Sequence, residues 1–136
     1  MLRDVKSNVA MLVGHSPASR SGASGVASAI INMGQYLTAS FLVNTGVYTG
    51  SGALAGKLQY SSSSSFGSDV NDDDGSTGNT AAIASIPASS ATRFHIKQPV
   101  NEAKPYYRLL LTDSVAAVIY SSEFVGIPKV TPVSYS

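Results

Sequence analysis

Cysteine and tryptophan are absent from this sequence of 136 residues, and charged side chains are scarce. Without cysteine, neither a disulfide nor a thiolate metal site can form. Charged residues make up 12% of the chain, whereas soluble domains average roughly 25%. Serine, threonine, asparagine and glycine must therefore supply most of the polar surface. The formal net charge is +1, so the charge balance favours neither nucleic acid nor an anionic membrane as a partner.

Two kinds of protein have so few charges. One is a secreted β-protein with a neutral surface, and the other is a subunit whose surface is buried against partners, since interface cores are depleted of charge. The apolar run from Val9 to Val13 has five residues. A secretory signal needs about 7–15 apolar residues and a membrane span about 20. We therefore expect synthesis in the cytoplasm without a signal peptide or membrane segment, which weakens the secreted alternative.

Helix-forming patterns are nearly missing, and what the chain has instead is alternation of apolar and polar residues, which is typical of strands. In one such run, Phe94 and Ile96 point one way while Arg93, His95 and Lys97 point the other. Clear alternation marks residues 36–44, 54–61, 92–98 and 106–113. Weaker strand signals mark residues 26–32, 81–86, 115–120 and 124–127.

About seven or eight short antiparallel strands separated by turns predict an all-β fold, either a jelly roll or a β-sandwich. The length fits a single domain. We expect residues 1–15 to be an N-terminal arm or the first strand, and residues 16–25 to be a flexible linker. The core would then span residues 26–127, followed by a C-terminal tail of residues 128–136.

The N-terminal segment has two open interpretations. Its apolar side chains precede the polar stretch 16–25, so they form either an arm that packs on a neighbouring protein or the first strand of the same sandwich. In the first case these side chains contact a partner. The residues concerned are Leu2, Val5, Val9, Met11, Leu12 and Val13.

One motif approaches that of a hydrolase. Gly14-His15-Ser16-Pro17-Ala18 resembles the nucleophile elbow Gly-x-Ser-x-Gly, which requires a strand that turns directly into a helix. The residues that follow, 19–22, are poor helix formers. We therefore predict that the protein is not an enzyme.

An acidic segment resembles the start of a calcium loop, with Asp69, Asn71 and Asp73 at the first three ligand positions. Asp74 stands where the loop needs glycine, and Thr80 stands where it needs glutamate. We expect residues 71–80 to form a solvated, mobile loop. We predict neither a metal nor a cofactor.

The basic stripe of Arg93, His95 and Lys97 is better interpreted as a polar outer face than as a nucleic-acid site. A nucleic-acid site needs more positive charge and interleaved aromatic side chains. The same stripe is suited to an acidic patch on a protein partner.

The C-terminal third carries a recognisable pattern. An aromatic and arginine-containing strand, 106–112, is followed by an apolar strand, 115–120, and then by a closing segment, 125–133, with the form Val-Gly-Ile-Pro and then Pro-Val. This pattern resembles small structural proteins of tailed bacteriophage heads, and in size it is similar to the jelly-roll cement proteins of podophages. The residues that carry the resemblance are Tyr106, Arg108, Gly126, Pro128, Pro132 and Val133.

The resemblance implies a cement or decoration protein on the capsid surface of the virion, made in the host cytoplasm. Its partner would be the phage major capsid protein, bound across capsomer joints, and it would act as a homo-oligomer, with a dimer favoured over a trimer. Two alternatives stay open. One is a phage tail or baseplate subunit, and the other is a carbohydrate-binding β-sandwich module, which would need exposed aromatic side chains.

The sequence also bears on oligomerisation independently of the resemblance. Residues 81–86 and 115–120 contain no charged residue, although exposed edge strands are usually protected by charge or proline. At least one of these runs is therefore central in its sheet or covered by a partner. A two-fold contact is the commonest way to cover such a surface.

Overall fold

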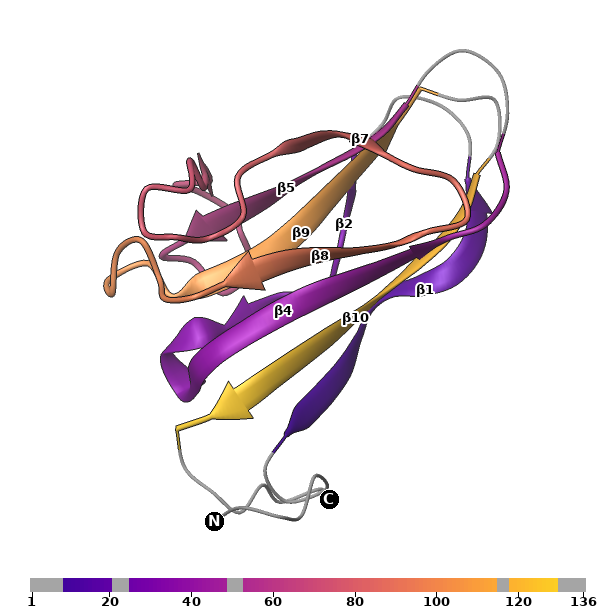
Figure 1. The fold of residues 1–136 in the computed structure, drawn as a ribbon. Coiled ribbons are helices and arrows are strands. Elements are labelled where there is room, and N and C mark those ends of the chain that lie inside the picture. The colour runs from indigo at the N-terminus through magenta and orange to yellow at the C-terminus, as the bar shows by residue number, and fades with distance from the viewer. Residues whose placement is uncertain (1–8, 21–24, 49–52, 115–117, 130–136) are drawn as a thin grey trace.

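Two antiparallel β-sheets face each other across one apolar core in the computed structural model, which describes residues 9–20, 25–48, 53–114 and 118–129 (Figure 1). The first sheet has the order β1 (Ala10–Arg20), β10 (Val118–Pro128), β4 (Tyr36–Thr45) and β8 (Ala91–Ile96). The second has the order β2 (Val26–Ala27), β9 (Tyr106–Asp113), β5 (Leu54–Ser61) and β6 (Asn71–Asp72). In addition, β3 (Ile31–Asn32) pairs with β9 and β7 (Ile83–Ile86) with β5, and a short 3-10 helix covers Met33–Gln35.

The strand order is that of a jelly roll. Strands β2 and β3 share one position beside β9, and β6 and β7 share one position beside β5. The described residues therefore form eight strand positions, which run in the orders 1-8-3-6 and 2-7-4-5 in the two sheets. Eight positions in two facing sheets form the double-sheet arrangement of this fold, and the predicted all-β sandwich is confirmed.

The core follows from the alternation along each strand. In β9, Tyr107, Leu109 and Leu111 are buried while their neighbours are half-exposed, because successive side chains of a strand point to opposite faces. The buried aromatic rings of Phe41 and Phe124 meet edge to face at 5.4 Å in the same interior. Burial of these apolar faces is the main force that holds the two sheets together.

Most predicted strands are found, with two differences in how they divide. The run 26–32 is two short strands, β2 and β3. The runs 115–120 and 124–127 belong instead to one strand, β10, of which residues 115–117 lie outside the described residues. Ser122 does not interrupt β10, because it is buried on the inner face with a hydrogen-bond partner.

The predicted linker is wrong for residues 16–20, which belong to β1. The pairs Ala18–Tyr120 and Ser19–Ile119 continue the ladder to β10, and two irregularities in register, between Val13 and Ala18, accommodate Pro17. Residues 10–15 are therefore the first strand of the sandwich rather than a separate arm. Residues 1–8, 21–24 and 130–136 lie outside the described part of the chain.

Candidate functional site

The outer face of the four-stranded sheet is the most distinctive surface of the molecule. On β4 the outward side chains are Thr38, Ser40 and Leu42, since Ala39, Phe41 and Val43 are buried. Directly opposite residues of antiparallel strands share a face, so Met11 lies on the outer face with Val125, and Val13 with Glu123. The same rule places Arg93 and His95 of β8 there, opposite Leu42 and Ser40.

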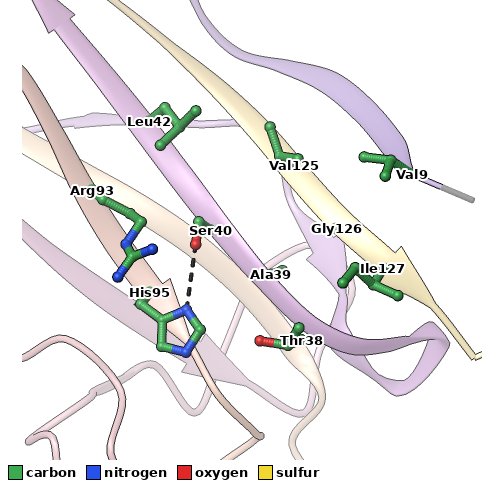
Figure 2. A pocket seen from close by; sticks show the side chains of 10 residues that line it. All are labelled: Val9, Thr38, Ala39, Ser40, Leu42, Arg93, His95, Val125, Gly126 and Ile127. Carbon is green, nitrogen blue, oxygen red and sulfur yellow. Dashed lines mark hydrogen bonds between the residues drawn. The ribbon is translucent and has the colours of Figure 1, made fainter. Parts of the chain in front are cut away.

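A groove of about 400 Å³ runs across the middle of this face, and we call it the central groove (Figure 2). One side is apolar, with Val125 and Ile127 of β10 and Val9 just before β1. The other side is polar, and there His95 Nδ1 lies 3.4 Å from Ser40 Oγ. The lining residues are Val9, Thr38, Ala39, Ser40, Leu42, Arg93, His95, Val125, Gly126 and Ile127.

Exposed apolar side chains are concentrated on the strands of the four-stranded sheet. Among the described residues, nine large apolar side chains are exposed, and six of them lie on β1, β4 or β10. A smaller hollow of about 200 Å³ is lined by Met11, Leu12, Val13 and Glu123. Met11, Leu12 and Val13 are 55%, 47% and 61% exposed. We call the segment Ala10–Val13, at the border of the sheet, the β1 edge.

The segment that resembled a nucleophile elbow lies within β1, and the next element that the structure describes is a strand, β2, rather than a helix. His15 is buried, with Nδ1 2.7 Å from Ser122 Oγ and Nε2 2.8 Å from the carbonyl oxygen of Val26. Because a carbonyl only accepts, Nε2 carries the proton that it donates to Val26, and Nδ1 forms the second hydrogen bond with the Ser122 hydroxyl. The pair links β1 and β10 to β2 of the other sheet, and this is a structural role.

The acidic segment 69–74 does not gather its carboxylates in one place. Asp69 binds Lys104 at 3.0 Å, while Asp72 binds Lys57 at 3.1 Å and accepts a hydrogen bond from Gln59. These contacts hold the pKa of Asp69 below its usual value, chiefly through Lys104, and the pKa of Asp72 below its usual value, chiefly through Gln59. Within the described residues, no group of three or more His, Asp or Glu is arranged to hold a metal ion.

Asp73 contradicts the expectation of a solvated loop, because it is 4% exposed. Its Oδ2 accepts hydrogen bonds from Asn79 Nδ2 at 2.7 Å and from the Tyr107 hydroxyl at 3.2 Å. Burial, and then the neighbouring Asp73 carboxylate, raise the pKa of Tyr107. This buried polar cluster fastens residues 73–79 to the end of the sandwich.

The residues that carry the phage resemblance are divided between the two sheets. Arg108 is on the outer face of β9, where it donates to Gln59 Oε1 and lies 4.4 Å over the Phe66 ring. Tyr106 begins the same strand, whereas Gly126 and Pro128 are in β10 of the other sheet. They form no common site. Pro132, Val133, Leu2 and Val5 lie outside the described residues.

Gly126 has a packing role at its position. A Cβ atom there would lie 2.7 Å from Cδ1 of Tyr36 and 2.9 Å from Cε1 of Phe124, closer than carbon atoms approach without a shift of the rings. The absence of a side chain lets Tyr36 and Phe124 meet edge to face, with ring centroids 5.0 Å apart. The glycine in the resemblance pattern is thus explained by this close approach.

Comparison with known proteins adds no name to these observations. No family model, curated protein or solved structure matches this chain. Over the residues that the structure describes, no helix has the length and apolar character needed to cross a membrane. Evidence for function must therefore come from this chain's own sequence and surfaces.

Sequence reasoning pointed to some of these features and missed others. It predicted a partner contact for Met11, Leu12 and Val13, which are exposed in the structure, and it placed Arg93 and His95 on an outward face. The central groove was missed, because its apolar side belongs to β10 and its polar side to β8, which are not adjacent in the sequence or in the sheet. The alternation within each strand was the available signal, but it does not give the order of strands.

Proposed function

We propose that this protein is a non-enzymatic structural subunit that binds other proteins through the outer face of its four-stranded sheet, and that it decorates and stabilises a bacteriophage capsid. The observation that carries the proposal is the central groove. It places apolar Val125 and Ile127 beside Arg93 and His95 on one open sheet face. Apolar side chains next to polar and charged ones on one surface are common in protein–protein interfaces.

The assignment to a capsid is based on the sequence pattern of residues 106–133, and the fold and the low charge support it. Jelly rolls occur in viral capsid proteins and also in lectins, so the fold alone leaves both classes open. The surface favours the capsid, since every aromatic side chain among the described residues is buried or only partly exposed. A glycan site would be expected to present such a ring for stacking.

In this proposal the central groove binds the phage major capsid protein across joints between capsomers. The subunit would then raise the temperature at which filled heads rupture, because it ties neighbouring capsomers together. A tail or baseplate subunit would use the same kind of surface, so the location of the protein in the particle distinguishes these two assignments.

The first experiment is to purify particles produced from the genome that encodes this chain and to separate heads from tails. We expect the chain in the head fraction, with density on the outer shell in a cryo-electron microscopy reconstruction. Heads that lack the chain should rupture at a lower temperature. Recovery only in tails, or absence from the particle, would contradict the capsid assignment.

The second experiment tests the surface with a matched pair of variants. Ile127 and Val70 are exposed to nearly the same extent, 41% and 42%, but only Ile127 lines the central groove. Ile127→Lys should weaken binding to undecorated heads at least about tenfold, since it places a charge in the apolar part of the interface. Val70→Lys should bind like the unmodified chain. Equal binding by both variants would exclude the groove as the interface.

A further inference from the structure

The borders of the two sheets are protected unequally. An unpaired strand edge is a template for another strand, and proteins usually shorten, charge or cover it. Both borders of the second sheet are short: β2, β3 and β6 have two residues each and β7 has four. The first sheet has longer border strands, the six-residue β8 and the eleven-residue β1.

The β8 border is covered by the segment that precedes β7. The His95 amide donates to Thr80 Oγ1 at 2.8 Å, and the Thr80 amide donates back to the His95 carbonyl at 2.8 Å. The Lys97 amide, just beyond β8, donates to Asn79 Oδ1 at 2.7 Å. This side of the sheet therefore cannot accept another strand without losing these bonds.

The β1 border is covered over only part of its length. From Gly14 onward it approaches the second sheet, where the Ala29 amide donates to the Gly14 carbonyl and His15 binds the Val26 carbonyl. Ala10–Val13 is different, because among the described residues β10 is its one paired strand. This β1 edge contains no charge and no proline, the two protective features that edge strands commonly have.

We propose that the β1 edge binds the β1 edge of a second copy, antiparallel and across a two-fold axis, so that two four-stranded sheets form one continuous sheet. A second copy is the expected partner because every copy carries the same open edge. A different protein would need an open strand edge of its own. The pairing also matches chemically. A two-fold axis perpendicular to the sheet keeps the same face outward in both copies. Met11 and Val13 of one copy therefore meet apolar side chains of the other copy on the outer face. On the opposite face, Leu12 meets Leu12 or Ala10 of the other copy.

Charge favours the same arrangement. Residues 9–19 contain no Asp, Glu, Lys or Arg, so two copies meet without like charges opposed across the axis. Glu123, next to Val13 on β10, remains one strand away from the contact. The proposal does not depend on capsid binding, for which the central groove rather than the β1 edge is the surface.

The experiment is a charge exchange at Leu12, measured on the full chain by sedimentation equilibrium. The unmodified protein should form dimers, and Leu12→Lys and Leu12→Glu should each weaken dimerisation at least about tenfold, because identical charges then lie opposite or diagonal to each other. An equimolar mixture of the two variants should restore dimers. Val70→Lys and Val70→Glu, at a similar exposure in the loop just before β6, should dimerise normally.

Several results would overturn the proposal. A monomeric unmodified chain at high concentration would do so, and so would dimers that persist in both Leu12 variants. Loss of dimers that mixing does not restore would exclude pairing across a two-fold axis. Circular dichroism checks that each variant is folded. If the Leu12 variants unfold, the same exchange at Val13, which is 61% exposed on the outer face, supplies the test.

Discussion

The two borders of the four-stranded sheet differ in whether other residues cover their unpaired backbone groups. At β8, side chains from residues 79 and 80 occupy backbone groups that would otherwise invite another strand. At the β1 edge, the described residues provide no such cover. The covered border carries the charged Arg93, while the open one is wholly apolar over Ala10–Val13. Protection of an edge is thus decided by what packs beside the strand as well as by the strand itself.

The largest expected effect comes from removing the cover at β8. Asn79→Ala deletes the acceptor for the amides of Lys97 and Gln98 and the donor to the buried Asp73 carboxylate. Buried polar groups left without partners are costly, so we expect a loss of about 3 kcal/mol in the free energy of unfolding. Urea denaturation measures it. Asn101→Ala, in an exposed loop, is the control and should change stability by less than about 0.5 kcal/mol.

A second pair of variants compares how much the two halves of β1 contribute to stability. His15→Ala removes hydrogen bonds to Ser122 and to the Val26 carbonyl, and we expect it to lower the free energy of unfolding by about 2 kcal/mol. Leu12→Ala, on the open half, should lower it by less than about 1 kcal/mol when measured on the monomer, since Leu12 is 47% exposed. Equal losses would mean that the two halves are held in the same way.

A smaller loss of stability is expected when one hydrogen bond to the β8 border is removed. Thr80→Val keeps the side-chain volume and removes the hydroxyl that accepts from the His95 amide. We expect about 1 kcal/mol of destabilisation and faster hydrogen exchange at His95. The Phe94 amide, on the neighbouring residue, serves as the internal reference. Unchanged exchange at His95 would show that this hydroxyl does not protect the border.

The smallest effect concerns the border at β6, which Asp72 fastens to Lys57 and Gln59 of β5. The pKa of Asp72 is lowered from 3.8 in the folded protein, so its stabilising contribution is present above that pH and is lost as pH falls through the folded value. Asp72→Asn should therefore reduce the loss of stability between pH 5 and pH 2 by less than about 1 kcal/mol. Glu102→Gln, in an exposed loop, is the matched control for thermal unfolding across this range.

The alternation of apolar and polar residues predicted the fold class, the long strands β4, β5, β8 and β9, and the direction of many side chains. It separated Phe94 and Ile96 from Arg93 and His95 correctly, because the period of two is a local property of extended backbone. The sequence also indicated that at least one of the uncharged runs 81–86 and 115–120 would be central in its sheet or covered by a partner, and residues 118–120 are in β10, between β1 and β4.

How far β1 extends and which borders are covered depend on contacts between segments far apart in the sequence. The segment 16–20 falls in the predicted linker, because the serine, proline and glycine of residues 16–25 suit loops. The ladder to β10 and the bond from His15 to Ser122, 107 residues away, make it a strand. Asn79 likewise covers β8, although the sequence around it is typical of a loop. Such partners are distant in sequence, so no local pattern specifies them until the sheets assemble.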